Sequence, residues 1–218
     1  MKDIIKLILV GGSGTCRDVI ELIKSINKKL FRYKILGILD DSIPLGKLNN
    51  GVKVLGPISD YSKLRDVRFV DCLGSSKNYN KRKKIIEKNG FVYSQFETLI
   101  HHSSFIGDQV KIRQGSIIFP NVVVLSKVCI GHHVTILSGT VINHDVEIGD
   151  WSIIGSGCML SGGVKIGKSC YLGSSSSIRE KVEIGNGSLV GMGAAVINNV
   201  AKCTEVVGVP AKFLRNVK

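Results

Sequence analysis

Long apolar runs are missing from this 218-residue sequence. The apolar stretch from Ile4 to Val10 is far shorter than the roughly 20 residues that a membrane-spanning helix needs. The first residues also lack the charged segment, apolar segment and small-residue cleavage site of a secretory leader. We therefore expect a cytoplasmic globular protein without membrane insertion, long enough to bury a core in one large domain or two smaller ones.

Metal-binding cysteine patterns are missing as well. The sequence contains no CxxC pair, and no histidine stands at metal-ligand spacing from a cysteine. This disfavours a zinc site and a disulfide framework, so we expect no metal ion and reduced thiols that act as small hydrophobic side chains. The six cysteines are Cys16, Cys72, Cys129, Cys158, Cys170 and Cys203.

Acidic residues are few: 17 Asp and Glu stand against 30 Lys and Arg, which gives a formal net charge of +13. Such a charge raises the question of nucleic acid binding. However, the basic residues are concentrated before residue 100 without interleaved aromatic residues, and the run from Lys81 to Lys84 is typical of the solvated face of a short helix. We expect no nucleic acid partner, because a basic surface suits small phosphate-bearing anions equally well.

From residue 100 onward an aliphatic residue returns every six positions. From Ile106 on, a small or valine-like residue stands two positions earlier, and glycine often follows directly after the aliphatic residue. A period of six is the signature of a parallel β-helix, in which three six-residue sides close one coil. Each residue should therefore lie over the one 18 positions away, with the aliphatic residue inward and the glycine allowing a sharp corner. The aliphatic positions are Ile100, Ile106, Ile112, Ile118, Val124, Ile130, Ile136, Ile142, Ile148, Ile154, Leu160, Ile166, Leu172, Ile178, Ile184, Val190 and Val196.

The first hundred residues have a different pattern. They predict an apolar strand, a GGSG turn, a helix beginning near Arg17 or Asp18, and a second strand at 33–41. A third strand is expected at 69–73 and a second helix at 82–89. Taken alone, GGSG fits a plain turn equally well. Polar residues follow all three strands, however, and the carboxyl edge of a parallel sheet is a usual binding crevice. The candidate substrate-binding residues are Gly12, Ser13, Gly14, Thr15, Asp40, Asp41, Gly74, Ser75, Ser76 and Arg82.

This change of pattern predicts a Rossmann-like α/β domain at 1–98, followed by an all-β parallel β-helix at 99–218. Several motifs then carry a family resemblance: GGSGTCRDV, GILDD, GSSKNYNKRKKI, the unbroken hexads, NHD at 143–145, VGMGAAVINNV and VVGVPAK. The chain resembles the NeuD/PglD-type sugar acetyltransferases of bacteria over nearly its whole length. The resemblance implies a left-handed β-helix, a homotrimer with acetyl-CoA between neighbouring β-helices, and a nucleotide-linked sugar bound by the N-terminal domain. It also implies a place in surface polysaccharide or glycan biosynthesis.

His144 is the candidate general base for such a transfer. Imidazole is a usable base near neutral pH, and the adjacent Asp145 could fix its tautomer, because neighbours at a corner need not point apart. One coil beyond 144 stands Gly162, which leaves room for a thioester and offers its N–H as the candidate oxyanion donor. Alternatively, His144 is a simple exposed turn residue. That role is also expected of His101, His102, His132 and His133.

The resemblance further implies that acetyl-CoA runs along the upper coils. Small residues there would contact the pantetheine arm, and the GVPAK segment would lie near the adenine and 3′-phosphate. These cofactor residues are Gly162, Ser174, Gly191, Gly193, Ala194, Pro210 and Lys212, although Lys212 is equally compatible with a solvated basic tail. Two departures stand out. Many relatives have Gly-His-Gly where this chain has Gly14, Thr15 and Cys16, and a second histidine of some relatives would fall at Ile153.

Other classes remain as alternatives. A zinc hydratase of the γ-carbonic-anhydrase type needs three histidines that meet, but His132 and His144 lie at different corners. A nicotinamide-dependent oxidoreductase needs two nucleotide-binding halves, and the first hundred residues are too few for both. A non-catalytic scaffold would lose nothing when His144 is changed. Serine acetylation is disfavoured because the N-terminal domain of those enzymes is helical.

Among sugars, we predict that the acceptor is the amino group of a nucleotide-linked amino sugar. The alternative is O-acetylation of sialic acid or of another sugar hydroxyl.

Overall fold

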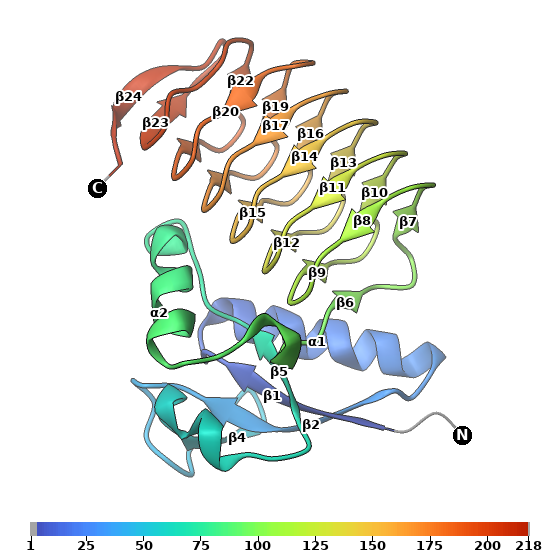
Figure 1. The fold of residues 1–218 in the computed structure, drawn as a ribbon, viewed down its shortest axis with the longest axis vertical. Coiled ribbons are helices and arrows are strands. Elements are labelled where there is room, and N and C mark those ends of the chain that lie inside the picture. The colour runs from blue at the N-terminus through green and yellow to red at the C-terminus, as the bar shows by residue number, and fades with distance from the viewer. Residues whose placement is uncertain (1–3, 218) are drawn as a thin grey trace.

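The computed structural model describes residues 4–217 and shows a Rossmann-like domain followed by a left-handed parallel β-helix, which confirms the predicted fold class (Figure 1). The N-terminal domain lies along one side of the β-helix, from the first coils, where Ile117 shares its core, to the upper coils, where the Gly187 carbonyl accepts the Tyr79 hydroxyl. The first strand of the β-helix, β6, is Leu99–Ile100. The predicted domain limits, 1–98 and 99–218, stay a prediction.

The N-terminal sheet has five strands in the order β3-β4-β2-β1-β5, and only β3 is antiparallel to its neighbour. Alternate residues of β1 are buried on opposite faces: Leu7 and Leu9 pack with α1, and Ile8 and Val10 pack with an aromatic cluster. The elements are β1 (Ile5–Val10), α1 (Gly14–Lys29), β2 (Tyr33–Leu39), β3 (Leu48–Asn49), β4 (Val52–Gly56), β5 (Arg68–Asp71) and α2 (Arg82–Lys88), with 3-10 helices at Ile58–Lys63, Tyr79–Lys81 and Tyr93–Gln95.

Three local predictions for this domain were wrong. Helix α1 begins at Gly14 rather than near Arg17, because Ser13 takes extended angles and the chain becomes helical directly after it. The second and third strands end at Leu39 and Asp71. Their early ends have one cause: the Asp40 carboxylate accepts the N–H of residue 42 and the Asp71 carboxylate that of residue 73, and such side-chain turns compete with sheet pairing. The β3–β4 hairpin was not predicted.

The β-helix has three faces, each a parallel sheet. Face 1 holds β7 (Phe105–Ile106), β10 (Val123–Val124), β13 (Val141–Ile142), β16 (Met159–Leu160), β19 (Ser177–Ile178) and β22 (Ala195–Val196). Face 2 holds β8 (Lys111–Ile112), β11 (Cys129–Ile130), β14 (Glu147–Ile148), β17 (Lys165–Ile166) and β20 (Glu183–Ile184). Face 3 holds β6, β9 (Ile117–Ile118), β12 (Thr135–Ile136), β15 (Ile153–Ile154), β18 (Tyr171–Leu172), β21 (Leu189–Val190), β23 (Thr204–Val207) and the antiparallel β24 (Lys212–Asn216).

The predicted 18-residue register is confirmed. Val141 pairs with Met159 and Ile142 with Leu160, and the other rungs up to Val196 follow the same spacing. The last rung is shorter, because Val190 pairs with Val206, 16 positions away. The aliphatic positions form one continuous core along the β-helix. Ile100 is the exception, because its side chain at the first rung is exposed.

The predicted role of the corner glycines needs correction. The left-handed backbone angle lies three residues after each aliphatic position from Ile106 to Val190, as at His133, Asp145 and Gly163, and not at the glycine directly after it. That glycine serves close stacking instead: a Cβ on Gly149 would lie 2.6 Å from the carbonyl carbon of Gly167 in the next coil. Glycine is therefore required there by the approach of two backbones.

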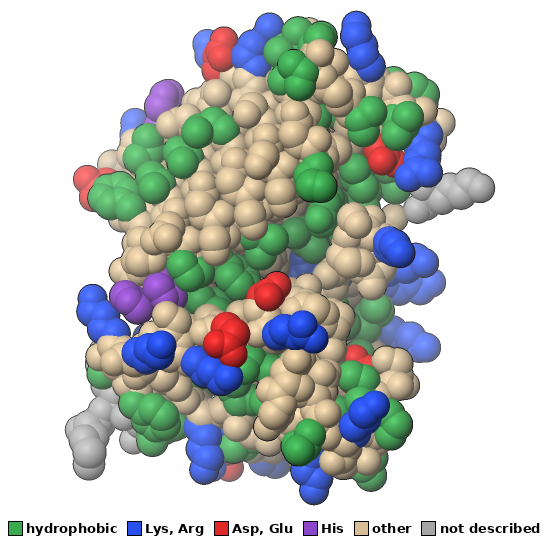
Figure 2. Space-filling model, turned by 180° about the vertical axis from the view of Figure 1, so that it is seen from behind, with side chains coloured by type: hydrophobic (Ala, Val, Ile, Leu, Met, Phe, Trp, Pro, Cys, Tyr) green, Lys and Arg blue, Asp and Glu red, His purple; other side chains and the backbone are tan. Residues whose placement is uncertain are grey.

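The three faces carry different outward side chains. Face 3 is largely covered by the N-terminal domain: Ile117 and Phe119 share a core with α1, and Trp151 joins the aromatic cluster on the other side of the sheet. Face 2 carries charged residues, including the ion pair Lys165–Glu183 at 3.6 Å. Face 1 carries no charge outward on its strands; these residues are Phe105, Val123, Val141, Met159, Ser177 and Ala195. Seen from behind, the middle of the β-helix surface is accordingly uncharged over a broad area, while charged side chains gather on the domain below (Figure 2).

Candidate functional site

His144 and Asp145 lie at the corner where the chain passes from β13 on face 1 to β14 on face 2. Their side chains are 63% and 56% exposed, and His144 Nδ1 lies 2.8 Å from Asp145 Oδ2. Asp145 has a φ of 60°, in the left-handed region that Asp tolerates better than most residues. The corner thus turns two sequential side chains toward each other and leaves Nε2 of the ring free to meet a reactant.

Gly162 lies against the imidazole, as the stacking of coils predicts. A Cβ at this position would lie 2.7 Å from both Cε1 and Nε2 of His144, so a side chain there would push the ring aside. The next residue, Gly163, donates its N–H to the His144 carbonyl at 3.0 Å and fixes the two coils together. Within residues 4–217, no hydrogen-bond acceptor is found for the Gly162 N–H itself. A bare, unpaired N–H beside an imidazole suits the stabilisation of an oxyanion.

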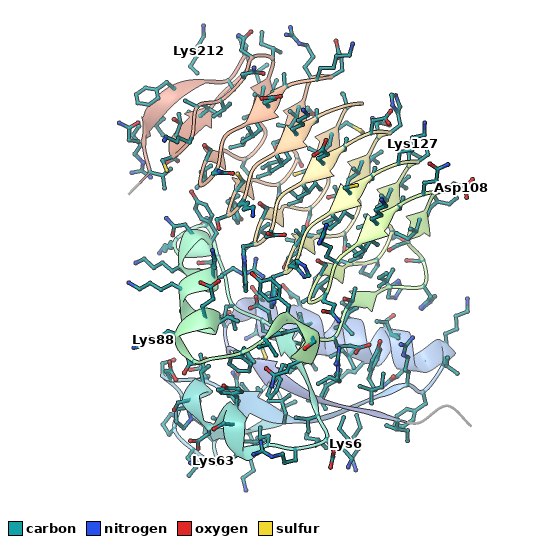
Figure 3. The ribbon with its side chains drawn as sticks, viewed as in Figure 1. Lys6, Lys63, Lys88, Asp108, Lys127 and Lys212 are labelled. Atoms are coloured by element: carbon teal, nitrogen blue, oxygen red, sulfur yellow. The ribbon has the colours of Figure 1, made fainter. Side chains whose placement is uncertain are left out.

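This corner lies opposite face 3, the face that packs on the N-terminal domain. Two further residues of the same edge, Asp108 and Lys127, point away from that domain in Figure 3. The Lys127 N–H donates to the Asp108 carbonyl, and the Asp145 N–H donates to Ser126 in the coil below. His144 is therefore separated from the glycine-rich loop of its own chain by the width of the β-helix.

The glycine-rich loop is only partly open. The Gly12 N–H donates to Asp40 Oδ2 at 2.7 Å, and the Gly12 carbonyl accepts from Asn49 at 2.7 Å, so this peptide is already bonded within the domain. Ser13 and Gly14 are exposed, and a Cβ on Gly14 would meet no atom within 4 Å. Among the residues of this loop, Gly14 at the start of α1 therefore leaves the most space for a phosphate group to approach the backbone.

Asp40 organises the loop that follows β2. Burial alone would raise the pKa of its carboxyl group, but hydrogen bonds from the Ser42 hydroxyl and from the N–H groups of Gly12, Ser42 and Ile43 lower this pKa below its ordinary value. Asp41 is exposed and accepts the Ile58 N–H at 2.8 Å. Both carboxylates are thus held in place at the carboxyl edge of the sheet.

Arg82 does not lie where a substrate could reach it. Its side chain is 1% exposed, and its guanidinium contacts Asp71 Oδ2 at 3.0 Å and the carbonyls of His133 and Trp151 at 3.0 and 3.2 Å. The run at 81–84 is therefore not wholly solvated, because α2 turns Arg82 inward between the domains. Of the other candidates after β5, Gly74 is buried, whereas Ser75 and Ser76 are exposed.

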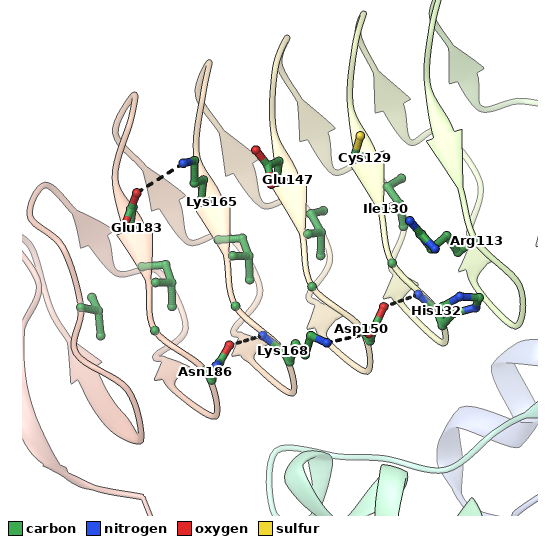
Figure 4. A pocket seen from close by; sticks show the side chains of 18 of the residues that line it. Arg113, Cys129, Ile130, His132, Glu147, Asp150, Lys165, Lys168, Glu183 and Asn186 are labelled. Carbon is green, nitrogen blue, oxygen red and sulfur yellow. Dashed lines mark hydrogen bonds and ion pairs between the residues drawn. The ribbon is translucent and has the colours of Figure 1, made fainter. Parts of the chain in front are cut away.

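A hollow of about 810 Å³ brings one substrate candidate together with two cofactor candidates. Ser76 of the N-terminal domain and Ser174 and Gly191 of the upper coils all line it. Gly193, Pro210 and Lys212 are exposed, but Ala194 is buried in the β-helix core and presents no side chain to a ligand. A larger hollow of about 930 Å³ lies on face 2, where Asp150 links His132 and Lys168, and it does not include His144 (Figure 4).

The other histidines differ from the prediction. His133 is fully buried, and His101 is buried with its Nε2 2.9 Å from the Ser25 hydroxyl, so neither is an exposed turn residue. His132 is half-buried, and only His102 is exposed as expected. Four cysteines are buried, but Cys129 and Cys203 are exposed.

Asp71 and His133 were missed by the sequence reasoning. They lie 3.1 Å apart although 62 positions separate them in the chain. Asp71 is the last residue of a buried strand, which is a signal for a functional carboxylate, but nothing in the sequence indicates that its partner is a β-helix corner. Across residues 4–217, no cluster of three or more His, Cys, Asp or Glu side chains is placed to hold a metal ion, and no helix has the length and apolar character to cross a membrane.

Comparisons with known proteins agree with this architecture. A model of the PglD N-terminal domain matches residues 6–89, and a model of the bacterial transferase hexapeptide repeats matches residues 130–162. A comparison with curated protein sequences finds no match.

Solved structures extend the likeness over the whole chain. PerB from Caulobacter crescentus, in complex with CoA and GDP-perosamine, is 25% identical with a TM-score of 0.84, and the match covers 98% of this chain and 99% of that one. WeeI from Acinetobacter baumannii AYE is 27% identical with a TM-score of 0.81, covering 97% and 100%. The acetyltransferase domain of PglB from Neisseria gonorrhoeae, in complex with acetyl coenzyme A, has the same fold at 24% identity and a TM-score of 0.70, covering 97% and 100%.

A β-helix of hexapeptide repeats with an exposed histidine at a corner defines a hexapeptide acyltransferase. The PglD-type N-terminal domain and the full-length structural matches narrow this class. The chain is therefore similar over nearly its whole length to sugar acetyltransferases of the NeuD/PglD type.

Proposed function

We propose that this enzyme transfers the acetyl group of acetyl-CoA to the amino group of a nucleotide-linked amino sugar. The observation that carries the proposal is the corner at 143–146, where an exposed imidazole is oriented by Asp145 at 2.8 Å and faces the bare position of Gly162. Support for the substrates comes from similar enzymes: PerB was solved with CoA and GDP-perosamine, and related structures of that N-acetyltransferase carry a histidine replaced by Asn or Ala.

In the proposed reaction, Nε2 of His144 takes a proton from the acceptor amine as its nitrogen attacks the thioester carbonyl carbon. Asp145 accepts the Nδ1–H and stabilises the imidazolium that forms. The Gly162 N–H holds the oxyanion, an interaction of a kind worth about 3 kcal/mol of barrier. The carbon–sulfur bond then breaks, and the imidazolium returns the proton to the CoA sulfur.

We propose that CoA lies along the upper coils near Ser174, Gly191 and Gly193, with its nucleotide end toward Pro210 and Lys212. The sugar nucleotide would lie on the loops at 12–15 and 74–76. Because the N–H groups of Gly191 and Gly193 already bond to the Val206 and Ser174 carbonyls, these two glycines would contribute open surface rather than donors.

The distance across the β-helix leads to a proposal for the assembly. His144 and the glycine-rich loop of one chain lie on opposite sides, so a sugar nucleotide held by the loop cannot reach the imidazole of the same chain. The uncharged face 1 borders the His144 corner and is not covered by the N-terminal domain. We infer that a neighbouring copy covers face 1 in a homotrimer and brings its loops to this corner.

An acetylation panel tests the function. Purified protein is incubated with acetyl-CoA and with UDP-, dTDP- and GDP-linked amino sugars, and separately with free and CMP-activated sialic acid. We expect a mass gain of one acetyl group on an amino sugar and release of free thiol in equal amount. Acetylation of sialic acid alone would replace the proposal with O-acetyl transfer, and turnover of no acceptor would contradict both.

A further inference from the structure

A buried polar cluster joins the two domains next to the predicted substrate loops. Asp71 at the end of β5 and Arg82 at the start of α2 form an ion pair at 3.0 Å, and both are almost fully buried. His133 from the β-helix corner at 131–134 contacts the same carboxylate oxygen through Nδ1 at 3.1 Å. Its ring stacks on Trp151 with 3.9 Å between ring centroids. The charge of Asp71 is thus shared between its own domain and the β-helix.

The cluster continues into both loops. The second carboxylate oxygen of Asp71 accepts the Leu73 N–H at 3.0 Å, which fixes the backbone that leads to Gly74. The Gly74 carbonyl accepts the Thr15 hydroxyl at 3.0 Å, so the loop after β5 is tied to the glycine-rich loop. A Cβ on Gly74 would clash with Arg82 and with Ile153 of face 3, so this loop is also held by packing from both sides.

The two domains do not need the buried polar cluster in order to pack together. An apolar interface between α1 and the residues Ile117, Phe119 and Leu137 already holds the domains together. Buried ion pairs contribute little net stability compared with apolar packing. The cluster also leaves Arg82 Nε, His133 Nε2 and Trp151 Nε1 buried without partners, which costs further free energy. A polar network retained at such a cost is best explained by the geometry that it specifies.

We propose that Asp71, Arg82, His133 and Thr15 are positioning residues that set the two substrate loops relative to the β-helix. This proposal rests on the proposed function, because the loops are those assigned to the sugar nucleotide. Thr15 then acts by tying the loops together rather than by touching the substrate. The proposal also gives a role to Thr15, which stands in the glycine-rich loop where relatives have a histidine.

The first test uses Thr15→Val, which removes the hydroxyl and keeps the shape of the side chain. We expect KM for the sugar nucleotide to rise roughly five- to tenfold, the effect of losing one hydrogen bond. KM for acetyl-CoA should stay unchanged, and Thr15→Ser should restore the original value. The matched control is Ser25→Ala, which removes the 2.9 Å interdomain hydrogen bond to His101 and leaves both loops untouched. An unchanged KM, or an equal rise for both substrates, would overturn the proposal.

The second test needs no turnover. Amide hydrogen exchange is compared between wild type, Asp71→Asn and Ser25→Ala, with peptides covering 11–16 and 72–78. We expect exchange in both segments to be roughly tenfold faster in Asp71→Asn, because one anchoring hydrogen bond is weakened. In Ser25→Ala it should stay unchanged. Faster exchange at 72–78 alone would show that the loops are not coupled and would overturn the proposal.

These two tests separate the two proposals. If the wild-type protein acetylates no acceptor, the proposed function fails, whereas the exchange result still decides whether the cluster holds the loops. If Asp71→Asn does not fold, Thr15→Val measured by exchange at 72–78 takes its place. Unchanged exchange in that variant would then overturn the coupling.

Discussion

One corner of the β-helix carries two histidines, and another carries a histidine followed by an aspartate. The two corners have the same backbone conformation but different roles. Residues 131–134 read GHHV and residues 143–146 read NHDV. The third residue of each has a left-handed φ, 55° at His133 and 60° at Asp145. One corner buries its third side chain against Asp71 of the N-terminal domain, and the other pairs Asp145 with the preceding histidine in the open.

The residue at the same position in the next coil explains part of the difference between the two corners. One coil after His132 stands Asp150, whose carboxylate accepts the His132 N–H at 2.8 Å and closes the corner. One coil after His144 stands Gly162, which has no side chain and therefore leaves space beside the imidazole ring. The position of a histidine within the hexad is therefore not enough to assign its role. The residue 18 positions later and the domain packed outside the corner must be known as well.

His144→Ala should have the largest effect on activity. We expect the acetylation rate to fall roughly 100-fold or more, the usual contribution of a general base, with the free energy of unfolding unchanged because the side chain is exposed. Initial rates and urea unfolding, followed by the fluorescence of the single Trp151, measure both. The control is His132→Ala at the matching position of the other corner, which should keep its activity. Full activity in His144→Ala would remove this residue from the mechanism.

Gly162→Ala should separate activity from stability. The added Cβ would displace the imidazole, so we expect a rate loss of roughly 10- to 100-fold while the fold stays intact. Gly149→Ala is the contrast, because its Cβ would meet the backbone of the next coil 2.6 Å away. That variant should lose about 1–3 kcal/mol of unfolding free energy through overpacking. Equal stability losses in the two variants would contradict the assignment of Gly162 to the active corner.

His133→Ala reverses the pattern of His144→Ala. Removing one partner of the buried cluster should lower the free energy of unfolding by about 3 kcal/mol, because Asp71 and the Trp151 ring lose their contact. Urea unfolding of both histidine variants under identical conditions provides the comparison. If His144→Ala proved the less stable variant, the two corners would have been assigned the wrong way round.

Asp71→Asn should show a pH-dependent loss of stability. Complete burial opposes ionisation of Asp71, but Arg82, His133 and the Leu73 N–H lower the pKa of the folded state below its ordinary 3.8. A lowered folded pKa means that the ionised form stabilises the fold above about pH 4, and that this contribution disappears as the pH falls further through the folded pKa. The stability difference between wild type and Asp71→Asn should therefore be full at pH 7 and shrink in acid.

The sequence predicted the β-helix far better than its contacts with the other domain. A strict period of six fixes which side chains point inward, and it placed Gly162 beside His144 by counting alone. Side chains at the domain interface have no such period. The environment of Arg82 and the pairing of Asp71 with His133 depend on segments 11 and 62 positions apart, so a local pattern could not reveal them. The reason for the corner glycines was also missed, because it lies in the packing between coils and not in the backbone angle of one coil.

The antiparallel strand β24 has a consequence for how the molecule ends. A stack of parallel rungs has no natural last member, and an uncovered terminal rung offers a row of free backbone donors and acceptors to any similar chain. By folding back along β23, the last strand occupies that row on face 3. Head-to-tail growth of this sheet into filaments is thereby discouraged at the last rung, which favours association of neighbours side by side.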